Sequence, residues 1–157
     1  TLPRSLLMML TPRFFGPALL VLATATAYPA WAAPLPPVHA QGPVRYLSGG
    51  IGKDEARAVE AAAPAWPAVL EFVKHDAQAK GDAFLAEVSV QVLDAHQHTV
   101  LATVSEGPFV LARLDPGRYE VRATVEGQTL TRTLQVPAQG SSRAVFVWPG
   151  RAAHPAA

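Results

Sequence analysis

Three side chains in the middle of the chain have the chemistry of a metal site. Asp94, His96 and His98 lie within a run of five residues. Residues two apart on an extended strand share a face, so the two imidazoles and the carboxylate could hold zinc. A solvated hairpin turn is the competing interpretation, because polar residues are common in such turns. His39 and His75 are remote in the sequence, so we favour the turn and assign no metal ligand.

A second set of side chains has the residue types of a hydrolase. Ser105, Glu106 and His98 could supply a nucleophile, an acid and a base. However, the chain contains no Gly-x-Ser-x-Gly elbow, and Ser105 is more simply a turn residue. A metal-dependent hydrolase that uses His96 and His98 is therefore our third hypothesis, and we assign no catalytic residue.

The glycine-rich stretch 48–55 invites comparison with a phosphate-binding loop. In that motif a glycine stands five positions before the glycine of the Gly-Lys pair, and a Ser or Thr follows the lysine. Here Leu47 stands where the first glycine is needed and Asp54 stands where the hydroxyl is needed. We therefore expect neither a nucleotide nor any other cofactor.

Arg118, Glu120 and Arg122 alternate with apolar residues, which predicts a strand with one charged face. Glu71 or Glu87 on neighbouring strands could pair with the two arginines. Such a face is either solvated, with ion pairs worth under about 1 kcal/mol each, or a recognition surface. We include these three residues in a candidate binding surface.

Trp66 and Trp148 complete the candidate binding surface. Exposed aromatic rings make platforms for sugar rings, whereas rings in alternation with apolar neighbours close a core. The alternation favours the core here. A glycan-binding function would require at least one of Trp66, Trp148 and Tyr119 to be exposed on a flat face.

Composition limits the functions that remain. The 157 residues include 13 Lys and Arg against 12 Asp and Glu, a net charge of +1. This balance provides no field that would attract nucleic acid or an anionic membrane, so we expect neither as a partner. The chain has no cysteine, which excludes disulfides, a thiol nucleophile and a cysteine-ligated zinc site.

Residues 1–32 have the pattern of a secretory signal peptide. Arg4 and Arg13 supply positive charge, an apolar stretch covers 14–27, and a small-x-small site ends at Ala32. The apolar stretch is shorter than the roughly 20 residues that span a bilayer, which favours cleavage over anchoring. We predict a periplasmic or secreted protein that contacts the membrane only before cleavage.

The segment after the signal peptide is predicted to be a linker and a short helix. Residues 33–47 are rich in proline and small residues near their start and lack periodicity, which is typical of a linker. A second possible cleavage site precedes Gln41 within it. Residues 48–65 are predicted to form a glycine turn and a helix over 53–63, with acidic residues in the first helical turn.

Short alternating segments fill the rest of the chain. The pattern predicts seven strands, at 66–73, 84–92, 98–104, 109–114, 118–125, 129–134 and 143–148. Glu126-Gly127 is predicted to be a two-residue hairpin loop. Arg132 falls on the apolar side of its strand, which suits a sheet edge or a bulge. Residues 149–157 are predicted to be a disordered tail.

The sequence Leu114-Asp115-Pro116-Gly117-Arg118-Tyr119-Glu120-Val121 and the closing strand at 143–148 resemble the carboxypeptidase regulatory-like domain. The resemblance covers residues 66–148 and implies an all-β, seven-stranded transthyretin-like or immunoglobulin-like sandwich. The glycine turn before it is similar to that of small exported proteobacterial proteins of unknown function that carry this domain. A fold of this kind does not by itself define a function.

These observations favour a non-catalytic exported module. Our first hypothesis is protein–protein interaction in the cell envelope, with an envelope protein as the partner. The second is binding of a carbohydrate or peptidoglycan, which domains of the resembled fold often perform.

Overall fold

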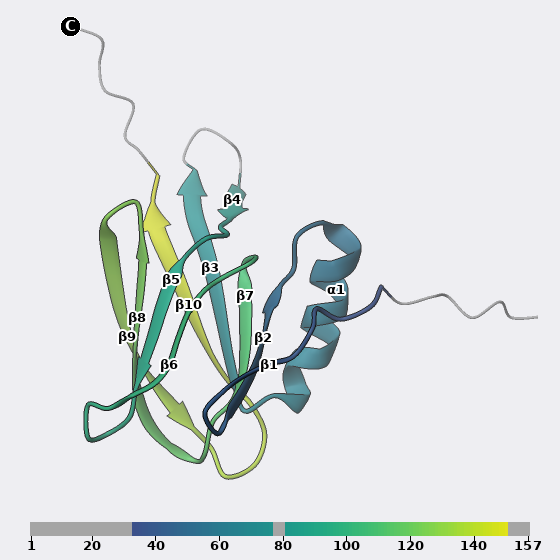
Figure 1. Cartoon of the computed structure of the whole chain (residues 1–157). Helices are drawn as coiled ribbons and strands as arrows, with labels where there is room; N and C mark the ends of the chain where they lie inside the picture. The colour runs from purple at the N-terminus through teal and green to yellow at the C-terminus, as the bar shows by residue number, and fades with distance from the viewer. Residues whose placement is uncertain (1–32, 77–80, 151–157) are drawn as a thin grey trace, which may run out of the picture. The chain divides into compact units, whose positions relative to one another are not determined.

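The chain folds into two β-sheets packed face to face, with one short helix against the outside of one sheet (Figure 1). This computed structural model describes residues 33–76 and 81–150. The predicted signal peptide and most of the predicted tail lie outside these residues. Within them the all-β prediction is confirmed in its main feature, a sandwich of two sheets.

The first sheet, sheet A, has six strands. Its order is β1 (His39–Gln41), β2 (Val44–Gly49), β7 (Phe109–Arg113), β3 (Ala68–Asp76) and β10 (Ser142–Pro149), and β4 (Gly81–Phe84) pairs with the second half of β3. Only the pairing of β10 with β3 is parallel among the described strands. The second sheet, sheet B, is antiparallel in the order β6 (Thr99–Val104), β5 (Ser89–Leu93), β8 (Gly117–Val125) and β9 (Gln128–Val136).

The main core fills the space between the two sheets. Alternate side chains of β3, β5, β8 and β10 point into it, as the period of two in the sequence predicts. Phe72, Phe146 and Trp148 form its aromatic centre, with ring centroids 5.7 to 6.3 Å apart. Each large side chain buried here contributes about 1.5–3 kcal/mol, so this layer dominates the stability of the fold.

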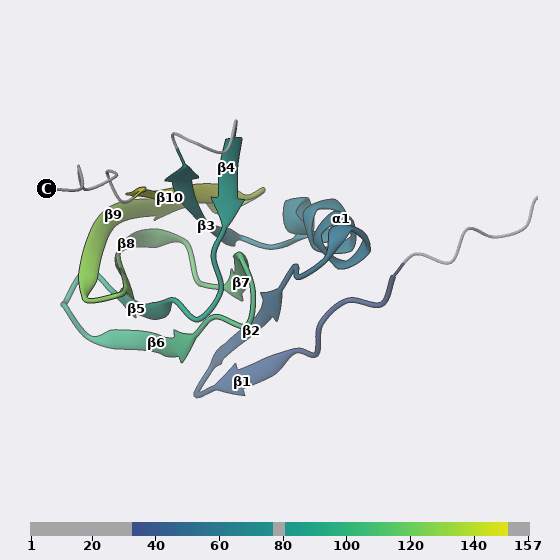
Figure 2. The same cartoon turned by 90° about the horizontal axis from the view of Figure 1, so that it is seen from above.

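A smaller core lies on the outer face of sheet A, under α1 (Lys53–Ala62) and the 3-10 turn η1 (Ala63–Ala65). The helix starts after Gly50 and Gly52, whose φ angles of 99° and 83° suit glycine. It buries Val59 against β2, β7 and the start of β3. Figure 2 shows α1 on the β2–β7 side of the sheet and away from β10. The helix therefore packs on the sandwich and covers only part of one face.

The structure has ten strands in the described residues, so the predicted count of seven was wrong. One reason is that residues 84–92 do not form a single strand. The chain leaves β4 after Phe84 and enters β5 at Ser89, with Glu87 at a φ of 58°. The amides of Glu87 and Val88 donate to the carbonyl and hydroxyl oxygens of Ser105, at 2.8 and 3.0 Å, instead of to a neighbouring strand.

The other two additional strands, β1 and β2, include residues 39–47 of the stretch predicted to be a linker. Val44 and Leu47 are buried, which fixes β2 in sheet A. The Gln41 side chain exchanges two hydrogen bonds with the backbone of Ala102 in β6, at 2.8 and 2.7 Å. The side-chain amide makes the same pair of hydrogen bonds that a neighbouring strand's backbone would make. It therefore connects the edge of sheet A to the edge of sheet B. A chain that began at Gln41 would lack most of β1.

The predicted hairpin loop follows β8, and another loop precedes it. Glu126-Gly127 is confirmed as a hairpin loop, with φ angles of 50° and 76°. Asp115-Pro116-Gly117 is different, because it carries the chain from β7 in sheet A to β8 in sheet B. The Tyr119 hydroxyl donates to the Asp115 carbonyl at 2.7 Å and holds this crossing in place.

The contact of α1 with sheet A can be tested through its single fully buried side chain. We expect Val59→Ala to lower the free energy of unfolding by about 1–3 kcal/mol, because it leaves a cavity between the helix and the sheet. Urea denaturation measures the change. Glu60→Ala, at the next and exposed position, is the control and should change stability little. Equal stability of Val59→Ala and the parent protein would contradict the packing.

Candidate functional site

The predicted charged face lies on the outer side of sheet B, but its ion pairs differ from the prediction. Arg122 donates from Nε and Nη2 to Glu120 Oε1, both at 2.6 Å, within the same strand. Glu71 lies in sheet A instead and accepts from Arg143 Nη1 at 2.7 Å. Glu71, one of the two partners considered for the β8 arginines, therefore pairs with a different arginine. Arg118 is exposed on the same strand as Arg122.

The aromatic residues of the candidate binding surface are buried. Trp66, Tyr119 and Trp148 are 6%, 9% and 2% exposed. Trp66 belongs to the core under α1, where the Arg113 guanidinium lies 4.5 Å from its ring centroid. Trp148 belongs to the main core. None of these three rings can form an open platform, so the condition that we set for glycan binding is not met.

The histidine hairpin is organised as a turn. Asp94 Oδ1 accepts from the backbone amides of His96 and His98 at 2.8 and 2.9 Å, and the two imidazole centroids lie 6.2 Å apart. The hydrogen bond from the His98 amide is the main cause that lowers the pKa of Asp94; desolvation opposes it, and the hydrogen bond from the His96 amide adds to the lowering. In the described ranges no three His, Cys, Asp or Glu residues gather in a way that could hold a metal ion.

The predicted hydrolase set is not assembled. His98 precedes β6 and Ser105 follows it, so at about 3.3 Å per residue the two lie roughly 20 Å apart. Ser105 is buried, and its hydroxyl accepts from the Val88 amide. Ser48, the other buried serine, likewise bonds backbone groups, donating to Phe109 and accepting from Glu106. Both hydroxyls therefore hold backbone segments together.

Sequence reasoning missed an exposed apolar surface on sheet A, which we call the open face. It consists of Phe84, Val145 and Val147, which are 56%, 37% and 41% exposed. They lie on the part of the outer face that α1 does not cover. The ring centroids of Phe84 and Phe109 lie 5.8 Å apart. The signal was present in β10, where two outward positions are valines although the inward positions already supply core residues.

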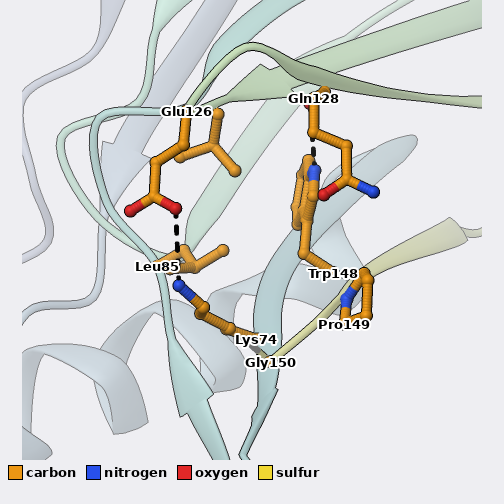
Figure 3. A pocket seen from close by; sticks show the side chains of 8 residues that line it. Lys74, Leu85, Glu126, Gln128, Trp148, Pro149 and Gly150 are labelled. Carbon is orange, nitrogen blue, oxygen red and sulfur yellow. Dashed lines mark hydrogen bonds and ion pairs between the residues drawn. The ribbon is translucent and has the colours of Figure 1, made fainter. Parts of the chain in front are cut away.

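Sequence reasoning also missed a cleft at one open end of the sandwich, which we call the end cleft. Its volume is about 580 Å³, and its lining comes from β3, β8, β9 and β10 and the loop after β4: Lys74, Leu85, Val125, Glu126, Gln128, Trp148, Pro149 and Gly150. Figure 3 shows two interacting pairs of residues that line opposite sides of it. Lys74 Nζ lies 3.5 Å from Glu126 Oε2, and Trp148 Nε1 donates to the Gln128 carbonyl at 3.1 Å.

No protein-family model matches the chain, and no curated protein matches it. Among the described residues no helix has the length and apolar character needed to cross a membrane.

The role of Asp94 as a turn residue predicts a pH dependence. Since the folded-state pKa is lowered below the usual 3.8, the carboxylate stabilises the fold above that pH, and this stabilisation is lost as the pH falls through the lowered pKa. We expect Asp94→Ala to be less stable than the parent at pH 6, with a smaller difference at pH 3. Urea denaturation at both pH values checks this, and a difference that grows on acidification would contradict it.

Proposed function

We propose that this chain is a non-catalytic, exported β-sandwich module that binds another protein of the cell envelope through the open face. The observation that carries the proposal is the exposure of Phe84, Val145 and Val147 on one face of a structured sheet, with Phe84 on one side of β3, the two valines on the other and the apolar Val73 between them. Exposed apolar side chains grouped on one face are typical of sites of protein interaction.

The neighbouring charges favour an apolar partner over a charged one. Arg143 and Glu71 neutralise each other beside the valines, at 2.7 Å. Such a surface provides little electrostatic steering, so binding would depend on burial of apolar area. Full burial of an exposed large apolar side chain contributes about 1.5–3 kcal/mol. These three are only 37–56% exposed, so covering them would contribute about 2–4 kcal/mol in total, which suits a modest and reversible interaction.

Three further observations support the proposal. The candidate hydrolase residues are separated or engaged in loop structure, which favours a binding role. The pattern of residues 1–32 favours export. The motif at 114–121 occupies the crossing between the sheets, which is compatible with membership of the carboxypeptidase regulatory-like domains. Burial of the tryptophans leaves the glycan alternative without a specific observation in its favour.

Site-specific photocrosslinking in the cells that produce the protein tests this function. We expect p-benzoylphenylalanine at Val147 to give a discrete adduct with an envelope protein on irradiation. The control is the same residue at Thr131, which is exposed on the outer face of sheet B. Adding Val145→Glu should abolish the adduct at Val147, because a buried unpaired carboxylate opposes binding.

Two results would contradict the proposal. One is an absence of adducts at Val147 when the protein is folded and exported. The other is the same set of adducts at Val147 and Thr131, since that would indicate random collision. A thermal melt of each variant shows that the sandwich itself is intact.

A further inference from the structure

The end cleft has the dimensions and lining of a small-molecule site. Its volume of about 580 Å³ lies within the range of roughly 300–1,000 Å³ that is typical of ligand pockets. Apolar groups of Leu85, Val125 and Trp148 form part of its surface, and Lys74, Glu126 and Gln128 supply polar groups. A ligand that fits must therefore combine an apolar body with a polar head.

The charges in the cleft indicate which head group it accepts. Lys74 lies on the inward side of β3, in alternation with the core residues Leu70 and Phe72, and its side chain is only 30% exposed. A partly desolvated ammonium group needs a counter-ion. Glu126 at the tip of the β8–β9 hairpin provides one, but that side chain is 72% exposed and the two charged atoms are 3.5 Å apart.

This pair is asymmetric, because its two members differ in what they lose on separation. Glu126 would remain hydrated if it left Lys74, whereas Lys74 would lose its counter-ion beside the apolar lining. An exposed ion pair of this length is worth under about 1 kcal/mol. A second carboxylate can therefore replace Glu126 at small cost, whereas a cation that binds Glu126 would leave Lys74 unpaired.

We propose that the end cleft binds a small amphipathic carboxylate. The ligand carboxylate accepts hydrogen bonds from Lys74 Nζ, and its apolar body lies against Leu85, Val125 and Trp148. Glu126 occupies the position of the anion when the cleft is empty of ligand. The Lys74–Glu126 and Trp148–Gln128 pairs, on opposite sides in Figure 3, bound the space that this ligand would fill.

Octanoate, octylamine and 1-octanol test the proposal, because they carry the same apolar chain with an anionic, a cationic and a neutral head group. Binding to the purified protein can be followed by calorimetry and by the indole N–H resonance of Trp148. We expect octanoate to bind and to shift this resonance, with octanol at least about threefold weaker and octylamine without effect.

Two substitutions should act in opposite directions. Lys74→Gln removes the ammonium group that binds the ligand carboxylate and should weaken octanoate binding at least about threefold. Glu126→Gln removes the carboxylate that competes with the ligand for Lys74 and should strengthen octanoate binding. Glu120→Gln is the matched control, because it alters an ion pair on the outer face of sheet B, and it should leave binding unchanged.

Equal binding of octanoate and octanol would overturn the proposal, as would the absence of any change at the Trp148 resonance at millimolar octanoate. Weaker binding to Glu126→Gln would also overturn it. If Lys74→Gln unfolds the protein, the Glu126→Gln result still decides the question. The end cleft is separate from the open face, so a failure here leaves the proposed protein interaction untouched.

Discussion

The structure depends on sheet A being apolar on both of its faces. One face packs on sheet B and forms the main core, and the other carries Val69, Phe109 and Leu111 under α1. Water must be excluded from both faces, but a ten-residue helix is too narrow to cover six strands. The remaining valines of β10 and Phe84 therefore stay exposed, and the proposed interaction surface is a direct consequence of this incomplete third layer.

Different side-chain contacts lie at the two ends of the sandwich. At one end the Tyr119 hydroxyl holds the crossing between the sheets, and Gln41 connects their edges through the backbone of Ala102. At the other end the Lys74–Glu126 pair and the Trp148 indole leave a cleft between the sheets. In the described residues every buried side-chain nitrogen and oxygen has a hydrogen-bond partner, so the polar groups that remain available are those on the surface and in such openings.

Alternation was a sound guide where strands lie between one buried and one solvated face. It predicted β8 and β10 nearly to their ends, and the Glu126-Gly127 loop between β8 and β9. It failed at 84–92, where Ser105 binds the backbone of Glu87 and Val88 across a distance in sequence that no local pattern reports. It also failed at 39–47, because the short strands there are stabilised by sheet pairing and by Gln41 rather than by a long periodic run.

The sequence by itself determined the two-sheet class of the fold, the short helix and its glycine start, because these follow from local periodicity and backbone preference. Only the tertiary structure decided which aromatic rings are buried, how Glu120 and Arg122 pair, and where the open face and the end cleft lie. Those features depend on which strands become neighbours and on how much of sheet A one helix can cover. Both are settled by contacts between residues far apart in the chain, such as Trp148 with Gln128 and Arg143 with Glu71.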